Sequence, residues 1–165
     1  MSVSRRSFVI GAGALAALAG AGLAFRPGQV SEAAEGRFEV SFTEAEWREK
    51  LSPEAFDILR AHGTERPFSS PLDDETRAGV FHCAGCHLAL FASETKYDSR
   101  TGWPSFWDHL PDAIGTSTDT AFMMIRTEVH CARCGGHQGH VFEDGPQPTG
   151  LRYCINGLAL RFEPA

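Results

Sequence analysis

The chain has 165 residues, of which 42% are hydrophobic and 22% charged, so its composition is that of a folded globular protein rather than a disordered one. Fifteen lysines and arginines stand against 21 aspartates and glutamates, and this acidic balance of −6 argues against a nucleic-acid-binding protein. Seventeen glycines and nine prolines separate short apolar runs, which is typical of a turn-rich β protein.

The first 35 residues have the pattern of an export signal rather than of a folded segment. Arg5 and Arg6 precede an uncharged run rich in glycine, alanine and leucine at residues 11–25, as in a twin-arginine signal peptide. The run is almost long enough to cross a membrane, so an uncleaved membrane anchor is the alternative, but its weakly apolar composition favours a signal peptide. We therefore predict a signal peptide and linker over residues 1–35 and one domain over residues 36–165. The expected location is the periplasm, with only transient membrane contact.

Two short helices are predicted at the start of this domain. Thr43 stands three residues before Glu46, which is the spacing of a capping box. Ser52 followed by Pro53 starts a second helix, which is expected to stop at Gly63. We expect both helices to serve packing rather than chemistry.

Short strand-like segments follow a long loop rich in proline, serine and aspartate at residues 64–74. Eight strands are expected, at residues 80–82, 88–91, 114–117, 122–126, 129–131, 139–142, 151–155 and 158–162. The predicted fold is mostly antiparallel β with a helical N-terminal flank.

Four of the five cysteines form two pairs with Cys-x-x-Cys spacing, Cys83 with Cys86 and Cys131 with Cys134. Two such turns supply four thiolates in the tetrahedral arrangement that structural Zn²⁺ prefers. Two disulfides, or a redox-active pair, are the alternatives. We predict one structural zinc ion per chain, and we expect the neighbouring histidines to stay outside a ligand set that four thiolates complete.

The fifth cysteine, Cys154, has Arg152 two residues before it and Asn156 two residues after it. Residues two apart share one face of a strand, so a guanidinium, a thiol and an amide are expected side by side. Because a cation favours the thiolate, we expect Arg152 to lower the pKa of Cys154. The alternative is a buried cysteine that acts as a small apolar residue.

Other polar and aromatic residues lie close to this strand in the sequence. His137 and His140, with Asp144 after them, can orient a proton donor beside a thiolate. The aromatic segment 102–107 contains Trp103. Aromatic residues are more often part of a core, but one at a pocket rim can hold a methyl or thioether group.

Together these segments resemble the type B peptide-methionine (R)-S-oxide reductases, or methionine-R-sulfoxide reductases. The resemblance extends over residues 42–162 and rests on residues 102–106, 134–142, 144–146 and 152–156, which occur in the family's order. It implies a tent-like fold of two antiparallel sheets, with zinc held by the four paired cysteines.

The resemblance also implies an activity and its residues. The substrate would be the R epimer of methionine sulfoxide in proteins or peptides, which would be reduced to methionine with a sulfenic acid as the intermediate. The implied site has Cys154 as nucleophile with His137, His140, Arg152 and Asn156 around it, and Trp103 and Phe142 for the substrate. A zinc-stabilised binding module of the same fold, without catalysis, is the alternative.

One position departs from the family's pattern. Many relatives carry a resolving cysteine just before the Gly-Trp-Pro-Ser-Phe segment, where this chain has Thr101. With four cysteines on zinc, none remains to form an internal disulfide with Cys154. We therefore expect an external thiol, such as a thioredoxin-like protein, to reduce the sulfenic acid. The protein is expected to be a monomer.

Overall fold

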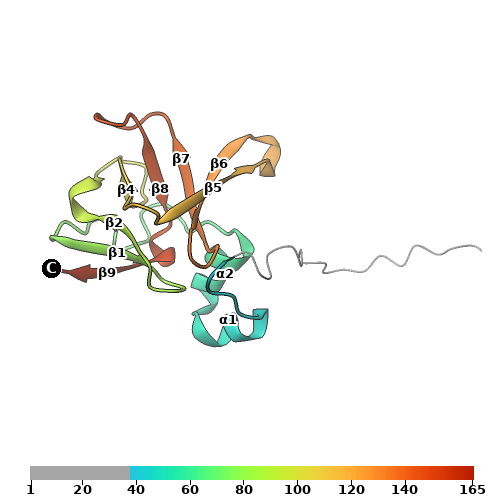
Figure 1. Cartoon of the computed structure of the whole chain (residues 1–165). Helices are drawn as coiled ribbons and strands as arrows, with labels where there is room; N and C mark the ends of the chain where they lie inside the picture. Colours follow the sequence, from blue (N-terminus) through green and yellow to red (C-terminus); the bar gives the residue numbers. More distant parts are fainter. Residues whose placement is uncertain (1–37) are drawn as a thin grey trace, which may run out of the picture. The chain divides into compact units, whose positions relative to one another are not determined.

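A computed structural model describes residues 38–165, so the predicted export segment lies outside the described residues (Figure 1). The helices span Glu44–Lys50 (α1) and Pro53–Ala61 (α2). The strands span Gly79–Cys83 (β1), Ala89–Ala92 (β2), Lys96–Tyr97 (β3), Ser105–Phe106 (β4), Ile114–Asp119 (β5), Arg126–Cys131 (β6), His137–Phe142 (β7), Arg152–Ile155 (β8) and Leu160–Pro164 (β9). Within this part of the chain, no helix is long and apolar enough to cross a membrane.

Both predicted helices are confirmed, together with the residues that start them. The Thr43 hydroxyl accepts from the Glu46 N–H at 3.3 Å, and the Glu46 carboxylate accepts from the Thr43 N–H at 2.8 Å. At α2, the Ser52 hydroxyl accepts from the Ala55 N–H at 3.2 Å. These bonds satisfy N–H groups that have no partner inside the helix. The predicted loop at residues 64–74 is also confirmed.

The strands form two antiparallel sheets, which confirms the predicted fold class. The smaller sheet has the order β2-β1-β9 and the larger one the order β3-β4-β8-β7-β6-β5. In the larger sheet, β8 lies between β4 and β7, and Cys154 stands opposite Ser105 on one side and His140 on the other. Residues directly opposite each other in antiparallel strands share a face, so the register groups these three side chains.

Phenylalanine rings join the two sheets. Phe81 of β1 meets Phe106 of β4 edge to face at 5.0 Å, and Phe106 stacks on Phe91 of β2 at 4.3 Å. All three rings are fully buried. Burial of such a side chain contributes about 1.5–3 kcal/mol, so this cluster is a main source of the attachment between the sheets.

The strand predicted at residues 122–126 is wrong. Residues Ala121–Met123 form a single 3-10 turn (η3), and pairing of β5 with β6 ends at Asp119 and Arg126. The apolar character of this segment suggested a buried strand, yet Ile125 is 85% exposed because the segment projects beyond the last paired residues. Apolar residues in a loop give the same sequence signal as a short strand.

Strands β3 and β4 were not predicted, because two residues are too few to show the alternation that marks a strand. The last strand begins two residues later than expected, since Gly157–Ala159 form another 3-10 turn (η4). This turn directly follows β8 and therefore decides where the residues after Cys154 point.

A glycine allows β7 and β8 to come together at the level of Cys154. Gly139 has φ 156, and a Cβ there would collide with the carbonyl oxygen of Cys154. The register of β6 against β7 also shifts between Val129 and His130. The extra residue of this bulge turns His137 towards His140, and their ring centroids are 5.4 Å apart.

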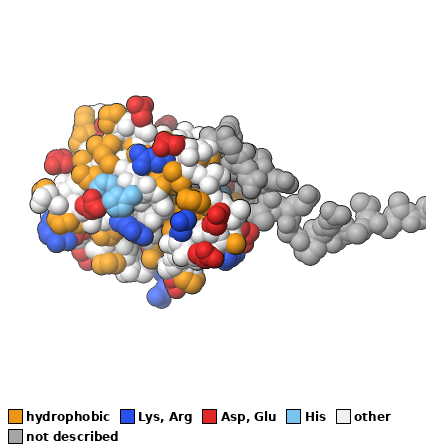
Figure 2. All heavy atoms as spheres, turned by 60° about the horizontal axis from the view of Figure 1, so that its bottom comes forward, with side chains coloured by type: hydrophobic (Ala, Val, Ile, Leu, Met, Phe, Trp, Pro, Cys, Tyr) orange, Lys and Arg blue, Asp and Glu red, His pale blue; other side chains and the backbone are white. Residues whose placement is uncertain are grey.

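Acidic, basic and apolar side chains are interspersed on the face shown in Figure 2. Exposed large apolar side chains are mostly isolated on the described surface, but Met123, Met124 and Ile125 are consecutive. That run lies in the connection between β5 and β6.

Candidate active site and metal centre

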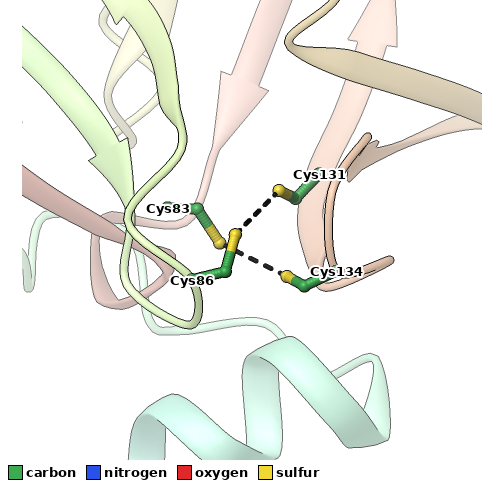
Figure 3. Close-up of side chains that lie close together, drawn as sticks. All are labelled: Cys83, Cys86, Cys131 and Cys134. Carbon is green, nitrogen blue, oxygen red and sulfur yellow. Dashed lines mark hydrogen bonds between the residues drawn. The ribbon is translucent and has the colours of Figure 1, made fainter. Parts of the chain in front are cut away.

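The four paired cysteines meet where the turn after β1 faces the turn after β6 (Figure 3). The Cys83 and Cys134 sulfurs are 3.7 Å apart, and the Cys86 and Cys131 sulfurs are 3.5 Å apart. A disulfide bond measures about 2.05 Å, so these are four separate thiols. Tetrahedral zinc with Zn–S bonds of about 2.3 Å requires sulfur–sulfur edges of about 3.8 Å, which these distances nearly match.

Hydrogen-bond donors surround this sulfur cluster. The Gly85 N–H lies 3.4 Å and the Gln138 side-chain amide 3.5 Å from the Cys83 sulfur. From α2, the Arg60 guanidinium reaches the Cys134 sulfur at 3.4 Å and the Cys134 carbonyl at 3.0 Å. Four thiolates around Zn²⁺ carry a net charge of about −2, which a cation and N–H donors offset. The expectation that the helices only pack is therefore too narrow, because α2 supplies Arg60.

The histidines beside the cysteine pairs do not join the sulfur cluster. His82 and His87 instead face the Glu163 carboxylate at 3.7 and 3.2 Å. His130 lies edge to face with Phe38, with ring centroids 5.8 Å apart. This agrees with the expectation that four thiolates complete the set.

Cys154 is half-buried on β8, beside a row of hydroxyl groups. The Thr101 hydroxyl lies 4.0 Å from its sulfur. The Ser99 hydroxyl is 2.8 Å from that of Thr101 and 2.7 Å from that of Ser105. Thr101, noted in the sequence only for not being a cysteine, is thus in contact with the thiol, and Ser99 and Ser105 support it.

Arg152 lies on the same face of β8 as Cys154, as predicted. Its guanidinium also forms an ion pair with Asp144. Two guanidinium nitrogens each lie 2.8 Å from an Asp144 oxygen, and the guanidinium also covers the Phe142 ring at 4.5 Å. Burial raises the pKa of Cys154, and the opposing effects of Arg152 and Thr101 are smaller. Arg152 does act to lower the pKa of Cys154, as predicted, but burial has the larger effect and the net shift is upward.

A carboxylate missed in the sequence connects two imidazoles. The Glu128 oxygen Oε1 lies 2.7 Å from Nδ1 of His137 and 3.0 Å from Nδ1 of His62, and the Ser117 hydroxyl donates to Glu128 as well. Burial opposes ionisation of Glu128, but the hydrogen bonds from His137, His62 and Ser117 outweigh it and hold its pKa well below the usual range. Nε2 of His137 is buried and has no hydrogen-bond partner among the described residues.

The only sequence signal for Glu128 is an acidic residue within an otherwise strand-like stretch. Its partners come from α2's C-terminal end, from β5 and from β7, so the sequence alone does not identify them. The cross-strand register places Glu128 opposite His140 and Ser117, on the face that carries Cys154.

His140 has a different carboxylate partner. Its Nε2 lies 2.8 Å from Asp119, which also accepts from the Arg126 guanidinium at 2.6 Å. Burial lowers the pKa of His140, with Asp119 acting against the shift. Hydrogen bonds from the Ala121 N–H and from His140 lower the pKa of Asp119 to about 2.

Both imidazoles line an open cavity of about 500 Å³. Its walls include His62, Asp119, Arg126, Glu128, His137 and His140, with Thr118, Thr120 and Ala121 along β5 and the following turn. His140, the cross-strand partner of Cys154, connects the cavity to the thiol.

Trp103 and Asn156 are both tied to the loop before β1. The indole N–H of Trp103 donates to the Glu65 carbonyl at 3.2 Å. Asn156 accepts from the Glu65 N–H at 3.1 Å and donates to the Gln138 carbonyl at 3.0 Å. Asn156 is buried just past the end of β8. The expected placement beside the thiol on one strand is therefore not observed, because the chain turns into η4 after Ile155.

Glu65 was not anticipated in this region. Its carboxylate is buried and accepts from the N–H groups of Gly157 at 2.5 Å and Leu158 at 3.1 Å. Burial raises its pKa, and these two hydrogen bonds act in the opposite direction. Glu65 thereby fixes the loop at residues 64–74 behind the strand that carries Cys154.

Comparisons with known proteins extend these observations. The SelR domain family model matches residues 51–164. Curated proteins called peptide methionine sulfoxide reductase MsrB are similar over most of the chain. The protein of Agrobacterium fabrum is 53% identical over 127 residues, which are 76% of this chain and 94% of that protein. Those of Leifsonia xyli and Methanosarcina barkeri are 48% and 52% identical, covering 81% and 75% of this chain and 97% and 88% of theirs.

Proposed function

Because the chain belongs to the SelR domain family, we propose that it is a peptide methionine sulfoxide reductase specific for the R epimer, with Cys154 as its nucleophile. One observation carries the assignment of the nucleophile. Cys154 is the cysteine outside the sulfur cluster, and it stands between His140 and Ser105 with Arg152 on the same face. A thiol among polar groups differs from a cysteine that fills an apolar core.

The reaction requires a nucleophile for sulfur and a proton for oxygen. The Cys154 thiolate attacks the sulfoxide sulfur while a proton is added to the sulfoxide oxygen. The sulfur–oxygen bond of the substrate then breaks, the oxygen becomes bonded to the Cys154 sulfur as a hydroxyl group, and methionine leaves. The net result is transfer of one oxygen atom from substrate to Cys154, which becomes a sulfenic acid. Arg152 and the Thr101 hydroxyl stabilise the thiolate that starts this step.

We assign the proton donor to His137. Glu128 binds Nδ1 of this ring, and within residues 38–165 no hydrogen-bond partner is found for Nε2. In His140, Nε2 is already bound to Asp119. His137 therefore has a fixed ring and a free nitrogen for proton transfer, while His140 and Asp119 shape the cavity wall.

Trp103 and Phe142 provide apolar surface for the substrate. The hydrogen bond to Glu65 fixes the Trp103 indole, and the Arg152 guanidinium covers the Phe142 ring. We propose that Trp103 contacts the S-methyl group of the substrate, since aromatic rings bind thioethers well. Asn156, with its amide bound to two backbone segments, holds the end of β8 in position.

The sulfur cluster is proposed to hold one structural zinc ion. Cys83, Cys86, Cys131 and Cys134 fit a closed tetrahedral site, which supplies folding energy and no open coordination position for chemistry. The disulfide alternative would require each bonded pair of sulfurs to approach by more than an ångström from the distances observed.

Recycling is proposed to need an external thiol. Four cysteines belong to the cluster, and the residue in contact with Cys154 is Thr101, whose hydroxyl cannot form a disulfide. Two external thiols then reduce the sulfenic acid, giving a disulfide and water. A thioredoxin-like protein is the proposed physiological donor.

A substrate pulse without reductant tests this recycling. We expect about one methionine per enzyme and a sulfenic acid on Cys154, detected by a specific label and mass spectrometry. The matched variant Thr101→Cys should instead form an internal disulfide with Cys154. An internal disulfide between Cys154 and a cluster cysteine in the wild-type enzyme, with release of zinc, would contradict the external-thiol scheme.

We also propose export of this protein through the twin-arginine route to the periplasm, where it acts as a monomer. The support is the Arg5-Arg6 pair and the weakly apolar run that follows. Folding before export would let the four thiols bind zinc before they meet an oxidising compartment. Replacing both arginines with lysine should retain the protein in the cytoplasm, and its mass in solution reports the oligomeric state.

The decisive test of the activity is an assay of residues 36–165 on the separated R and S sulfoxides of a blocked methionine. Turnover of the R epimer alone is the expected result. Turnover of neither epimer with any thiol donor would contradict the proposed function.

A further inference from the structure

The connection between β5 and β6 carries two side chains that the proposed reaction does not use. Met123 is fully exposed and Met124 is half exposed. Apart from Met1, these are the only methionines in the sequence. Met123 also has a left-handed backbone, φ 58, which is uncommon for a residue other than glycine, asparagine or aspartate. Packing of the thioether does not explain the presence of Met123.

We propose that Met123 and Met124 are oxidation sites and that their R sulfoxides are substrates of a second copy of this chain. The inference rests on the proposed function and names one substrate of it. A peroxide transfers one oxygen atom to the thioether and leaves water or an alcohol. Cys154 of the second copy then takes up that oxygen as its sulfenic acid, and two external thiols remove it as water while forming a disulfide.

Exposure makes these two thioethers reactive. Oxidation of methionine follows the access of the oxidant to sulfur, and solvent reaches Met123 from every side. The short turn around them is closed by one backbone hydrogen bond, from the Met124 N–H to the Ala121 carbonyl at 3.2 Å. The Ala121 N–H also donates to the Asp119 carboxylate at 2.8 Å, so the start of the turn is held in place. The exposed thioethers beyond it can therefore be reached by another molecule without rearrangement of the sheet.

The arrangement of the sheet argues against repair within one molecule. Three strand steps separate β8, which carries Cys154, from β5, and neighbouring strands lie about 4.8 Å apart, giving roughly 14 Å. Met123 also extends into solvent rather than into the chain's own cavity. A second copy is therefore the enzyme that meets this turn.

Oxidation at this turn has a consequence for the site. Thr120 and Ala121, which begin the turn, line the cavity that His137 and His140 share. A sulfoxide at Met123 or Met124 replaces an apolar thioether with a polar group just beyond this rim. Repair by a second copy would remove this added polar group from the edge of the cavity during oxidative stress.

The experiment uses two variants of the full domain. The substrate is zinc-loaded Cys154→Ser, treated with hydrogen peroxide at a dose that retains its zinc and then freed of oxidant. The enzyme, in catalytic amount with dithiothreitol, is a double variant with Met123→Leu and Met124→Leu, which carries no sulfoxide of its own. Mass spectrometry follows the oxygen adduct on the peptide that contains residues 121–126.

We expect the adduct to fall by about half, because peroxide forms both epimers and one enzyme reduces one of them. The same double variant should reduce the R sulfoxide of blocked methionine at the wild-type rate. If that control works and the adduct persists, the inference fails while the proposed function stands. If neither substrate is reduced, the proposed function itself fails.

Oxidised wild-type protein without added enzyme separates repair by a second copy from repair within one molecule. The fraction of sulfoxide repaired per unit time should fall about tenfold on tenfold dilution, because the reaction needs two copies to meet. A fractional repair rate that does not depend on concentration would overturn the assignment of a second copy.

Discussion

Cysteine occurs in two regions of this protein with opposite surroundings. In the cluster, each sulfur has other sulfurs within 4.8 Å, and Arg60, Gln138 and the Gly85 N–H surround the group. Cys154 instead has hydroxyl groups, a guanidinium and, across the strand, an imidazole. Four converging thiols favour a metal, whereas one thiol among proton donors favours nucleophilic chemistry. The same side chain therefore stabilises one region and reacts in the other.

The largest effect is expected at Cys154. Cys154→Ser should reduce turnover by at least about 10³-fold, because a serine hydroxyl cannot replace the thiolate. Zinc content and the unfolding midpoint should remain those of wild type. Steady-state assays, metal analysis and denaturant unfolding measure these three properties, and substantial turnover in this variant would contradict the assignment.

A substitution in the sulfur cluster should affect stability rather than the thiol that reacts. Cys86→Ser should release zinc and cost more than about 4 kcal/mol of unfolding free energy, which is the range expected when a structural metal is lost. Denaturant unfolding with metal analysis gives the result, and Cys154→Ser is the matched control. A variant that stays folded without zinc at wild-type stability would show that the cluster is no structural metal site.

Glu128 is expected to act on the reaction by holding the ring of the proposed proton donor, His137. Glu128→Gln should lower kcat about 10- to 100-fold, since the ring of His137 loses its charged partner. The hydrogen bond with Glu128 is the main cause of the raised pKa of His62, so that pKa should fall towards its ordinary value. NMR titration reads this shift, and Glu163→Gln is the control on an exposed carboxylate. An unchanged kcat would remove Glu128 from the mechanism.

The smallest expected effect concerns Arg152. Burial already raises the pKa of Cys154 and Arg152 opposes it, so Arg152→Gln should raise this pKa further. A shift of one unit slows alkylation of Cys154 about tenfold at a pH below the pKa. The pH profile of iodoacetamide labelling measures it, with the exposed Arg161→Gln as control. An identical profile would mean that Asp144 neutralises the guanidinium completely.

Local spacing made much of this protein readable from the sequence. The capping box at Thr43, the proline after Ser52 and the two Cys-x-x-Cys turns each lie within a few residues, and each is found as predicted. Strand alternation likewise identified most of β1, β2 and β5–β9, whereas the two-residue strands β3 and β4 left no pattern. The short apolar segment 122–126 was misread, because apolar residues in an exposed turn resemble those of a strand.

Three properties could therefore be read from residue order: the mostly β fold class, the division of the cysteines into four and one, and a threonine at position 101 where many relatives have a cysteine. These properties depend on residue type and on short separations along the chain. The tertiary structure alone decided the net pKa shift of Cys154, the pairing of Glu128 with His137 and His62, and the turn that takes Asn156 away from the thiol. Each depends on burial or cross-strand register, which arise only when segments distant in sequence pack together.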